Sequence, residues 1–153
     1  MKQHCINSLL YKLDKTARIA HVFCDKYFKE YALGEITFDE FIILDTVLCY
    51  PDICQRDLAK HVLKDTSHLS KMLNNLEKRE LIERPIDKKG NRTVRKIKIT
   101  ENGINLHAFA EQIALDFSNK ILYSIGIQKS KQCTETLNQI TEIITEKKEI
   151  IFE

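Results

Sequence analysis

The sequence has 153 residues, which fits one domain or one domain with helical extensions. Hydrophobic residues make up 43% of it and Gly and Pro together only six positions, so the composition favours a helix-rich globular fold and excludes low-complexity classes. The net charge is +2, and because no apolar run suits a membrane span or a signal peptide, we expect a cytoplasmic protein without a membrane partner.

A long helix is predicted from Ile6 to Tyr31, because its apolar residues recur at helical spacing. That stripe consists of Ile6, Leu9, Leu10, Leu13, Ala17, Ala20, Cys24, Tyr27, Phe28 and Tyr31. A helix so apolar on one side must be covered by another element. Gly34 is expected to end it, and Thr37 to cap a second helix that carries Phe41 and Leu44.

After a break at Pro51-Asp52, two short helices are predicted, and a short strand at Ile53 is expected to join the sheet that follows. The apolar positions of the first short helix are Leu58, Ala59, Val62 and Leu63. Asp65 is a suitable N-cap for the second. The apolar stripe of that second helix is Leu69, Met72, Leu73 and Leu76, spaced i, i+3, i+4 and i+7.

The opposite side of this second helix is polar and cationic. It presents Ser67, Lys71, Asn74 and Lys78, with His68, Ser70 and Asn75 on its flanks. A face that serves only solubility more often mixes both signs of charge, whereas this one has no carboxylate. Hydroxyls, amides and amines suit base edges and phosphates, so the pattern predicts a recognition helix.

A basic hairpin is predicted next. The run from Leu81 to Ile86 reads as an edge strand, since it contains Pro85, and the alternation from Thr93 to Thr100 reads as its partner. The turn between them is Lys88-Lys89-Gly90-Asn91. From Lys78 to Lys98 there are nine Lys or Arg against three Asp or Glu, a local net of +6 in a chain of +2. Charge concentrated in this way is expected where phosphates bind.

Two more helices complete the chain. The first is capped by Thr100 and runs to about Tyr123, and Gly126 separates it from a last helix over Ser130 to Phe152. The apolar stripe of the first is Ile104, Phe109, Ile113, Phe117, Ile121 and Leu122, and that of the last is Cys133, Leu137, Ile140, Ile143 and Ile144. A single chain would expose these stripes, which soluble proteins avoid. We therefore expect a homodimer held by the terminal helices.

The order of these elements resembles the MarR family of winged helix-turn-helix transcriptional regulators over nearly the whole chain. The matching motifs are residues 57–59, 65–71, 76–84, Arg92 and 99–103, preceded by Ile36-Thr37, Phe41 and Leu44. Three positions depart from the family pattern. Gly90 stands where an Asp often precedes the wing arginine, Glu80 replaces a glycine, and Cys54 replaces a Ser or Thr cap.

The resemblance and the residue pattern together predict a mostly α fold with a small β wing. The expected domains are an N-terminal dimerisation helix over residues 1–34, a winged helix-turn-helix DNA-binding domain over 35–100 and C-terminal dimerisation helices over 101–153. The expected function is that of a homodimeric, sequence-specific DNA-binding regulator, a repressor in preference to an activator, which reads a pseudo-palindromic operator in double-stranded DNA.

The DNA contacts divide into two groups. The major groove is assigned to Ser67, His68, Ser70, Lys71, Asn74 and Asn75. The wing and phosphate contacts are assigned to Thr66, Lys78, Arg84, Lys88, Lys89, Asn91 and Arg92. The resemblance implies that Arg92 reaches the minor groove.

The sequence gives less support to metal binding and catalysis. The five histidines are scattered without metal-ligand spacing, and no phosphate-binding loop, nucleophile elbow or zinc-protease motif occurs. We therefore expect no metal, no cofactor and no enzyme, although some family members hold a metal between subunits. The five cysteines form neither a disulfide framework nor a zinc site.

Three alternatives stay open for the releasing signal: a small ligand, thiol oxidation, or neither. Cys5 is the candidate redox thiol, near a helix start and near Lys2 and His4, against the alternative of an ordinary thiol. Its position does not match the cysteine of the peroxide-sensing branch of the family. Aromatic residues such as Tyr11 and Phe23 fit a ligand pocket and a plain core equally well. An alternative function, a winged-helix protein-interaction module, would use the same fold to bind an acidic partner.

Overall fold

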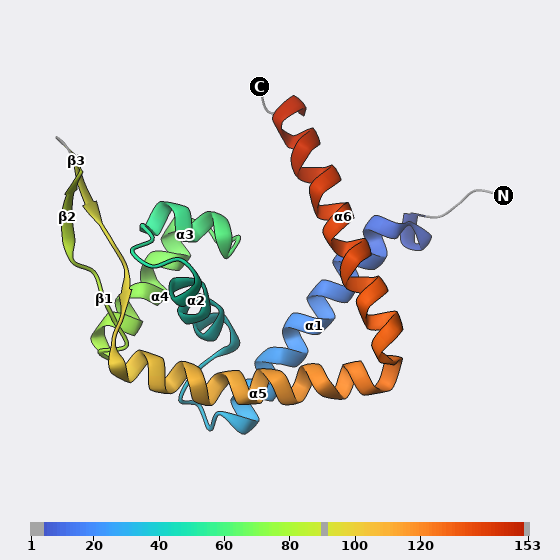
Figure 1. Cartoon of the computed structure of the whole chain (residues 1–153), viewed down its shortest axis with the longest axis horizontal. Helices are drawn as coiled ribbons and strands as arrows, with labels where there is room; N and C mark the ends of the chain where they lie inside the picture. The colour runs from blue at the N-terminus through green and yellow to red at the C-terminus, as the bar shows by residue number, and fades with distance from the viewer. Residues whose placement is uncertain (1–4, 90–91, 152–153) are drawn as a thin grey trace. The chain divides into compact units, whose positions relative to one another are not determined.

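The computed structural model describes residues 5–89 and 92–151, with side chains described for 6–86 and 95–146. The elements in chain order are a 3-10 turn at Cys5–Asn7, α1 Leu9–Tyr31, α2 Phe38–Cys49, α3 Gln55–His61, α4 Thr66–Lys78, β1 Ile82–Glu83, β2 Ile86–Lys89, β3 Arg92–Arg95, β4 Lys98–Ile99, α5 Glu101–Ile125 and α6 Ile127–Ile151 (Figure 1). This confirms the predicted mostly α fold with a small β wing. The chain divides into two compact units, residues 1–113 and 114–153.

The core of the first unit lies between α2, α3, α4 and the base of the wing. Its largest fully buried side chains are Phe28, Ile36, Ile43, Leu44, Leu58, Leu69, Leu73, Leu76, Ile82 and Ile97. The predicted apolar stripe of α4 is confirmed, because Leu69, Leu73 and Leu76 are completely buried and Met72 is half-buried. Burying side chains of this size contributes about 1.5–3 kcal/mol each, so this stripe anchors α4, which contacts α3 and β1.

Three helices begin at the capping residues that the sequence predicts. The Thr37 hydroxyl accepts from the Glu40 backbone N–H at 3.2 Å, Asp65 accepts from the His68 N–H at 2.8 Å, and Thr100 accepts from the Gly103 N–H at 3.0 Å. Each bond satisfies an N–H that has no partner within its own helix. The caps therefore fix where α2, α4 and α5 start.

Leu63 is not part of the apolar stripe of α3, and that prediction was wrong. Helix α3 ends at His61, and Leu63 follows it with a positive φ of 51° and 90% of its surface exposed. The chain has already turned toward α4 at this point. Lys64 fixes the turn, because its ammonium lies 2.7 Å from the Asp39 carboxylate on α2.

The wing consists of two short antiparallel ladders rather than one continuous hairpin. β1 pairs with β4, and β2 pairs with β3. Pro85 interrupts the first strand because it has no N–H to donate, and its carbonyl accepts from the Lys96 N–H at 3.1 Å. The strand predicted at Ile53 is reduced to a single bridge from Cys54 to Lys96, next to an Ile97 N–H bond to the Ile53 carbonyl.

Glu80, where the family pattern has glycine, adopts a left-handed conformation with φ of 57°. It follows α4 in a Schellman turn: the Leu81 N–H bonds to the Leu76 carbonyl and the Glu80 N–H to the Glu77 carbonyl. A side chain in this conformation costs free energy that glycine does not. We expect Glu80→Gly to raise the free energy of unfolding by about 0.5–1 kcal/mol. Urea denaturation measures this, and an unchanged or lower midpoint would contradict the prediction.

Helix α5 covers α2 with its first turns. The residues of α5 that are buried here are Gly103, His107, Ala110 and Ile113. Of the predicted apolar stripe, Ile113 is buried, whereas Ile104 and Phe109 are 46% and 47% exposed in the single chain. The buried face is set by His107, whose Nε2 lies 2.9 Å from the Asp45 carboxylate and whose ring stacks on Phe41 at 5.2 Å.

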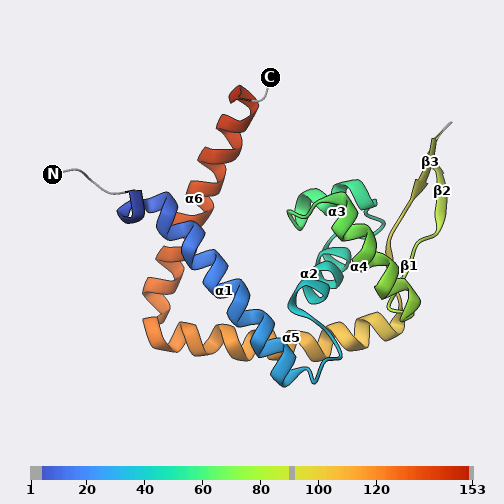
Figure 2. The same cartoon turned by 180° about the vertical axis from the view of Figure 1, so that it is seen from behind.

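The second unit contains the end of α5 and the whole of α6, which meet at Gly126 with φ of 85° (Figure 2). Large apolar side chains along it are exposed in the single chain. They are Leu115, Ile121, Tyr123, Ile125, Ile127, Leu137, Ile143 and Ile144. Within the described ranges, no helix combines the length and apolar character that a membrane span requires.

Candidate nucleic-acid interface

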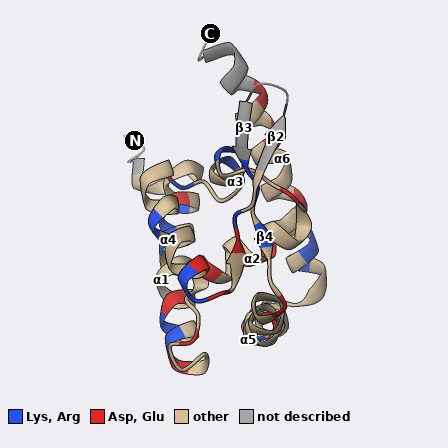
Figure 3. Cartoon of the chain, turned by 90° about the vertical axis from the view of Figure 1, so that its left-hand side faces the viewer, with Lys and Arg blue, Asp and Glu red and all other residues tan. Residues whose placement is uncertain are grey.

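The outward face of α4 is polar, as predicted. Ser67, Lys71, Asn74 and Lys78 are all exposed, and Figure 3 colours the Lys and Arg positions of the ribbon blue. On the flanks, His68 and Asn75 are exposed and Ser70 is half-buried. Thr66, the first residue of α4, is exposed as well. The structure therefore brings seven of the predicted contact residues together with Thr66 on one helix.

The start of α4 carries a partial positive charge from its free N–H groups. Asp65 accepts hydrogen bonds from the backbone N–H groups of His68 and Ser67, and these bonds hold the pKa of its carboxyl below the usual range. The Asp65 carboxylate therefore caps α4 at neutral pH and fixes the backbone that carries the first of the predicted contact residues.

The wing residues are described only by their backbone. Lys88 pairs with Thr93 across the β2–β3 ladder, and Lys89 pairs with Arg92 next to the turn. The ribbon extends beyond the helices of its unit (Figure 1). Asn91, and the side chains of Lys88, Lys89 and Arg92, lie outside the described residues, so their DNA contacts stay predictions.

Arg84 occupies a different place from the other predicted phosphate contacts. Its side chain is only 9% exposed and lies between the wing base and α4. Its Nε donates to the Glu77 carboxylate at 2.9 Å, and its Nη2 donates to the Asn74 Oδ1 at 2.6 Å. This placement favours a role in holding α4 and the wing together over a direct phosphate contact.

The Arg84 guanidinium also lowers the pKa of the Glu77 carboxyl, chiefly through their hydrogen bond. A carboxyl whose pKa is lower in the folded state stabilises the fold above its ordinary pKa, and this contribution is lost as the pH falls through the lowered value. We expect Glu77→Gln to lower the melting temperature at pH 7 and to have a smaller effect at pH 3. Equal losses at both pH values would show that this ion pair does not stabilise the fold.

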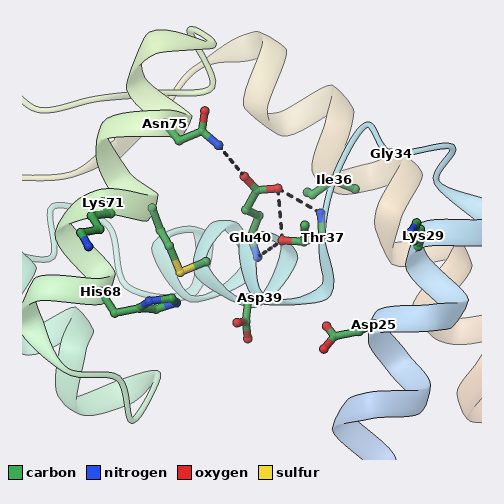
Figure 4. Close-up of a pocket in the computed structure, with 11 residues that line it drawn as sticks. Asp25, Lys29, Gly34, Ile36, Thr37, Asp39, Glu40, His68, Lys71 and Asn75 are labelled. Carbon is green, nitrogen blue, oxygen red and sulfur yellow. Dashed lines mark hydrogen bonds between the residues drawn. The ribbon is translucent and has the colours of Figure 1, made fainter.

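On the opposite flank, α4 is tied to α2 by a buried carboxylate (Figure 4). Glu40 is 6% exposed. Its Oε2 accepts from the Thr37 N–H at 3.0 Å, and its Oε1 accepts from the Asn75 Nδ2 at 3.3 Å and the Arg79 Nη1 at 3.0 Å. Arg79 donates in addition to the Glu35 carbonyl. A buried charge needs such partners, so this network fixes the C-terminal half of α4.

A hollow of about 590 Å³ lies beside this network, between α1, the start of α2 and α4 (Figure 4). Its lining residues are Asp25, Lys29, Gly34, Ile36, Thr37, Asp39, Glu40, His68, Lys71, Met72 and Asn75. Three of them, His68, Lys71 and Asn75, are also predicted DNA contacts. Any molecule in the hollow would therefore touch α4.

Sequence reasoning missed the charged residues that hold α4. Glu40 stands three residues after Thr37, which is the Thr-x-x-Glu signature of a capping box, and this signal was available. Its bonds to Asn75 and Arg79 join residues 35 and 39 positions apart. No local pattern reveals such pairs.

No three His, Cys, Asp or Glu side chains come close enough to hold a metal ion in the described part of the chain. Cys24 is buried on α1, and burial raises the pKa of its thiol. The Cys54 thiol donates to the Asp57 carboxylate at 3.0 Å. The side chain of Cys5 lies outside the described residues, and its proposed redox role is not tested.

Comparison with known proteins identifies related domains. The model of the MarR family matches residues 36–94. The search of curated proteins gave no match. Three of the similar solved structures each match this chain over most of its length and most of their own. Their sequence identities are low, so the likeness shows a shared fold. The transcriptional regulator SlyA has a TM-score of 0.77 at 20% identity, covering 95% of this chain and 99% of that one.

The other two were solved as complexes. PcaV from Streptomyces coelicolor, crystallised with its natural ligand, has a TM-score of 0.74 at 15% identity and covers 93% of this chain and 98% of its own. MepR from Staphylococcus aureus, crystallised with DNA, has a TM-score of 0.74 at 19% identity and covers 90% of this chain and 98% of its own.

Proposed function

Since the chain carries a MarR family domain over residues 36–94, we propose that it is a transcription regulator that binds a specific sequence in double-stranded DNA as a homodimer. We propose that the regulator is a repressor and that a bound effector releases it from its operator. The observation that carries the proposal is the outward face of α4, which is exposed, polar and free of carboxylates at Ser67, Lys71, Asn74 and Lys78.

Two observations support DNA as the partner. Positive charge is concentrated between Lys78 and Lys98, next to α4 in the chain, as phosphate binding requires. The MepR structure, which shares the fold, contains DNA. A helix of this kind enters the major groove, while a wing reaches the neighbouring backbone or minor groove.

The homodimer is supported by the apolar residues that one chain leaves exposed on α5 and α6, such as Leu137, Ile143 and Ile144. A second copy would bury them. Two-fold symmetry also places two recognition helices about 34 Å apart, one helical turn of DNA. The domain boundaries predicted at residues 34 and 100 separate the proposed dimerisation helices from the proposed DNA-binding domain.

Arg92, at the start of β3, is proposed to contact the minor groove from the wing. We expect Arg92→Ala to weaken binding to the operator and to reduce the salt dependence of log K by about one unit, because one cation near the phosphates is lost. Titrations at several salt concentrations measure both quantities. Unchanged affinity and slope would remove Arg92 from the interface.

The effector is proposed to bind in the hollow beside α4. An occupant there would contact His68 and Lys71 and thereby compete with DNA, and the similar PcaV structure holds a small ligand. Oxidation of Cys5 is the other releasing signal. Peroxide treatment of wild type and Cys5→Ser, followed by measurement of DNA affinity, distinguishes the two.

The alternative is a winged-helix module that binds an acidic protein. A regulator prefers its own site over random duplex DNA by roughly a thousandfold or more, whereas a protein-interaction module would bind duplexes only weakly and without sequence preference. Competition of a selected site against random duplex separates the two functions.

A further inference from the structure

The two adjacent asparagines of α4 are each held by a buried charge of opposite sign. Asn75 donates its Nδ2–H to the Glu40 carboxylate at 3.3 Å. Asn74 accepts at its Oδ1 from the Arg84 guanidinium at 2.6 Å. Glu40 lies on α2 and is 6% exposed, while the side chain of Arg84, after β1, is 9% exposed. Both amides are therefore fixed from behind by side chains that water scarcely reaches.

The chemistry of the two partners fixes which way each amide faces. A carboxylate has no proton to donate, so only the Nδ2 of Asn75 can face Glu40, as Figure 4 shows. A guanidinium has no acceptor, so only the Oδ1 of Asn74 can face Arg84. Neither amide can flip without placing two donors or two acceptors against each other.

The two asparagines flank the outward line of the helix. Successive residues in an α-helix are rotated by about 100°, so Asn74 and Asn75 lie on either side of the line formed by Ser67, Lys71 and Lys78. Both are exposed. The groups that remain free differ: Asn75 keeps its Oδ1 acceptor, with one N–H beside it, whereas Asn74 keeps its two Nδ2 donors.

We propose that Glu40 and Arg84 are positioning residues for base reading, which orient Asn75 as an acceptor and Asn74 as a donor toward the major groove. This rests on the proposed function. In the major groove the amino groups of adenine and cytosine are donors, and guanine O6 and N7 and thymine O4 are acceptors. Asn75 then reads an amino group, and Asn74 reads an acceptor, at neighbouring positions of each half-site.

The experiment begins with a selection from a random duplex pool, using wild type, Asn74→Ala and Asn75→Ala, which assigns one base-pair position to each asparagine. Glu40→Gln is expected to reduce the preference at the Asn75 position about tenfold, the size of one good base contact, and to leave the Asn74 position unchanged. Arg84→Met is expected to reduce the preference at the Asn74 position about tenfold and to leave the Asn75 position unchanged.

Each of these variants has a matched control. Thr37→Ala removes the two hydrogen bonds of the Thr37 hydroxyl but leaves the backbone bond of the cap and the Glu40 bond to Asn75. Glu77→Gln breaks the ion pair of Arg84 but leaves its bond to Asn74. Both controls are expected to lower stability without changing the preference at either position, since a merely structural role acts on all positions equally.

A second measurement does not use the Glu40 and Arg84 variants, so its result does not depend on whether they fold. Replacing the base opposite Asn75 by an analogue without its amino group should weaken wild type about tenfold and leave Asn75→Ala unaffected. The proposal would be overturned if wild type and Asn75→Ala lost equal affinity for the analogue duplex. It would also be overturned if Glu40→Gln and Arg84→Met changed the preference at all positions alike, provided that wild type still selects a site. If wild type selects no site, the proposed function itself fails.

Discussion

Gly103→Ala is expected to destabilise the winged domain by at least about 3 kcal/mol, a large part of the stability of a typical domain. A Cβ at Gly103 would lie 2.1 Å from the Leu81 carbonyl oxygen and 2.7 Å from the Ile99 Cγ1. The carbonyl also accepts from the Thr100 N–H, so it cannot move without losing that bond. The start of α5 and the base of the wing would have to separate, and DNA binding would be lost with them.

Gly126→Ala is the matched control, because no atom lies within 4 Å of the position of its Cβ. Its φ of 85° makes an alanine there strained by about 1–2 kcal/mol, but without a collision. Guanidinium denaturation of both variants separates the two effects. A Gly103→Ala protein as stable as Gly126→Ala would show that the close approach of α5 to Leu81 is not maintained in solution.

The second large effect is expected from Leu137→Glu combined with Ile144→Glu on α6. These side chains are 44% and 51% exposed in one chain and are proposed to be buried by the second subunit. Two carboxylates there would have to be desolvated in the dimer, so we expect a monomer. Since linked half-site contacts raise affinity by about 10²–10⁴-fold, affinity for the full operator should fall at least about a hundredfold.

The double variant Glu135→Gln and Glu142→Gln changes two charges on the other side of α6 and should remain dimeric. Sedimentation equilibrium reports the subunit state, and titration with the operator reports affinity. A Leu137→Glu, Ile144→Glu protein that still sediments as a dimer would place the interface elsewhere. A monomer that binds the operator as tightly as wild type would disprove the need for two subunits.

Local signals predicted most of the fold. Caps at Thr37, Asp65 and Thr100 and the 3.6-residue periodicity of α4 depend on residues close in sequence, and all were confirmed. The family resemblance marked Glu80 as a residue that replaces a glycine, and the structure gives this residue a positive φ. Leu63 was misassigned because its helical spacing continues past the point where α3 ends.

The parts that sequence could not predict depend on distant partners. From the sequence, Arg84 was predicted to contact phosphate because it lies in a basic run. In the structure its side chain is buried and bonds to Glu77 and Asn74. His107 reads as a scattered histidine, but it pairs with Asp45, 62 residues away. Which face of α5 is buried within one chain follows from that pair, and hydrophobic periodicity alone did not identify it, since Ile104 and Phe109 are exposed in the single chain.

The measurement that tests the central claim most directly is a selection of preferred duplexes from a random pool by the wild-type protein, repeated at two salt concentrations. A dimeric, base-reading regulator predicts enrichment of an inverted repeat whose half-sites are centred about ten base pairs apart, retained at the higher salt. If nothing is enriched, or if binding depends only on salt, then α4 does not read bases and the protein is not a sequence-specific regulator.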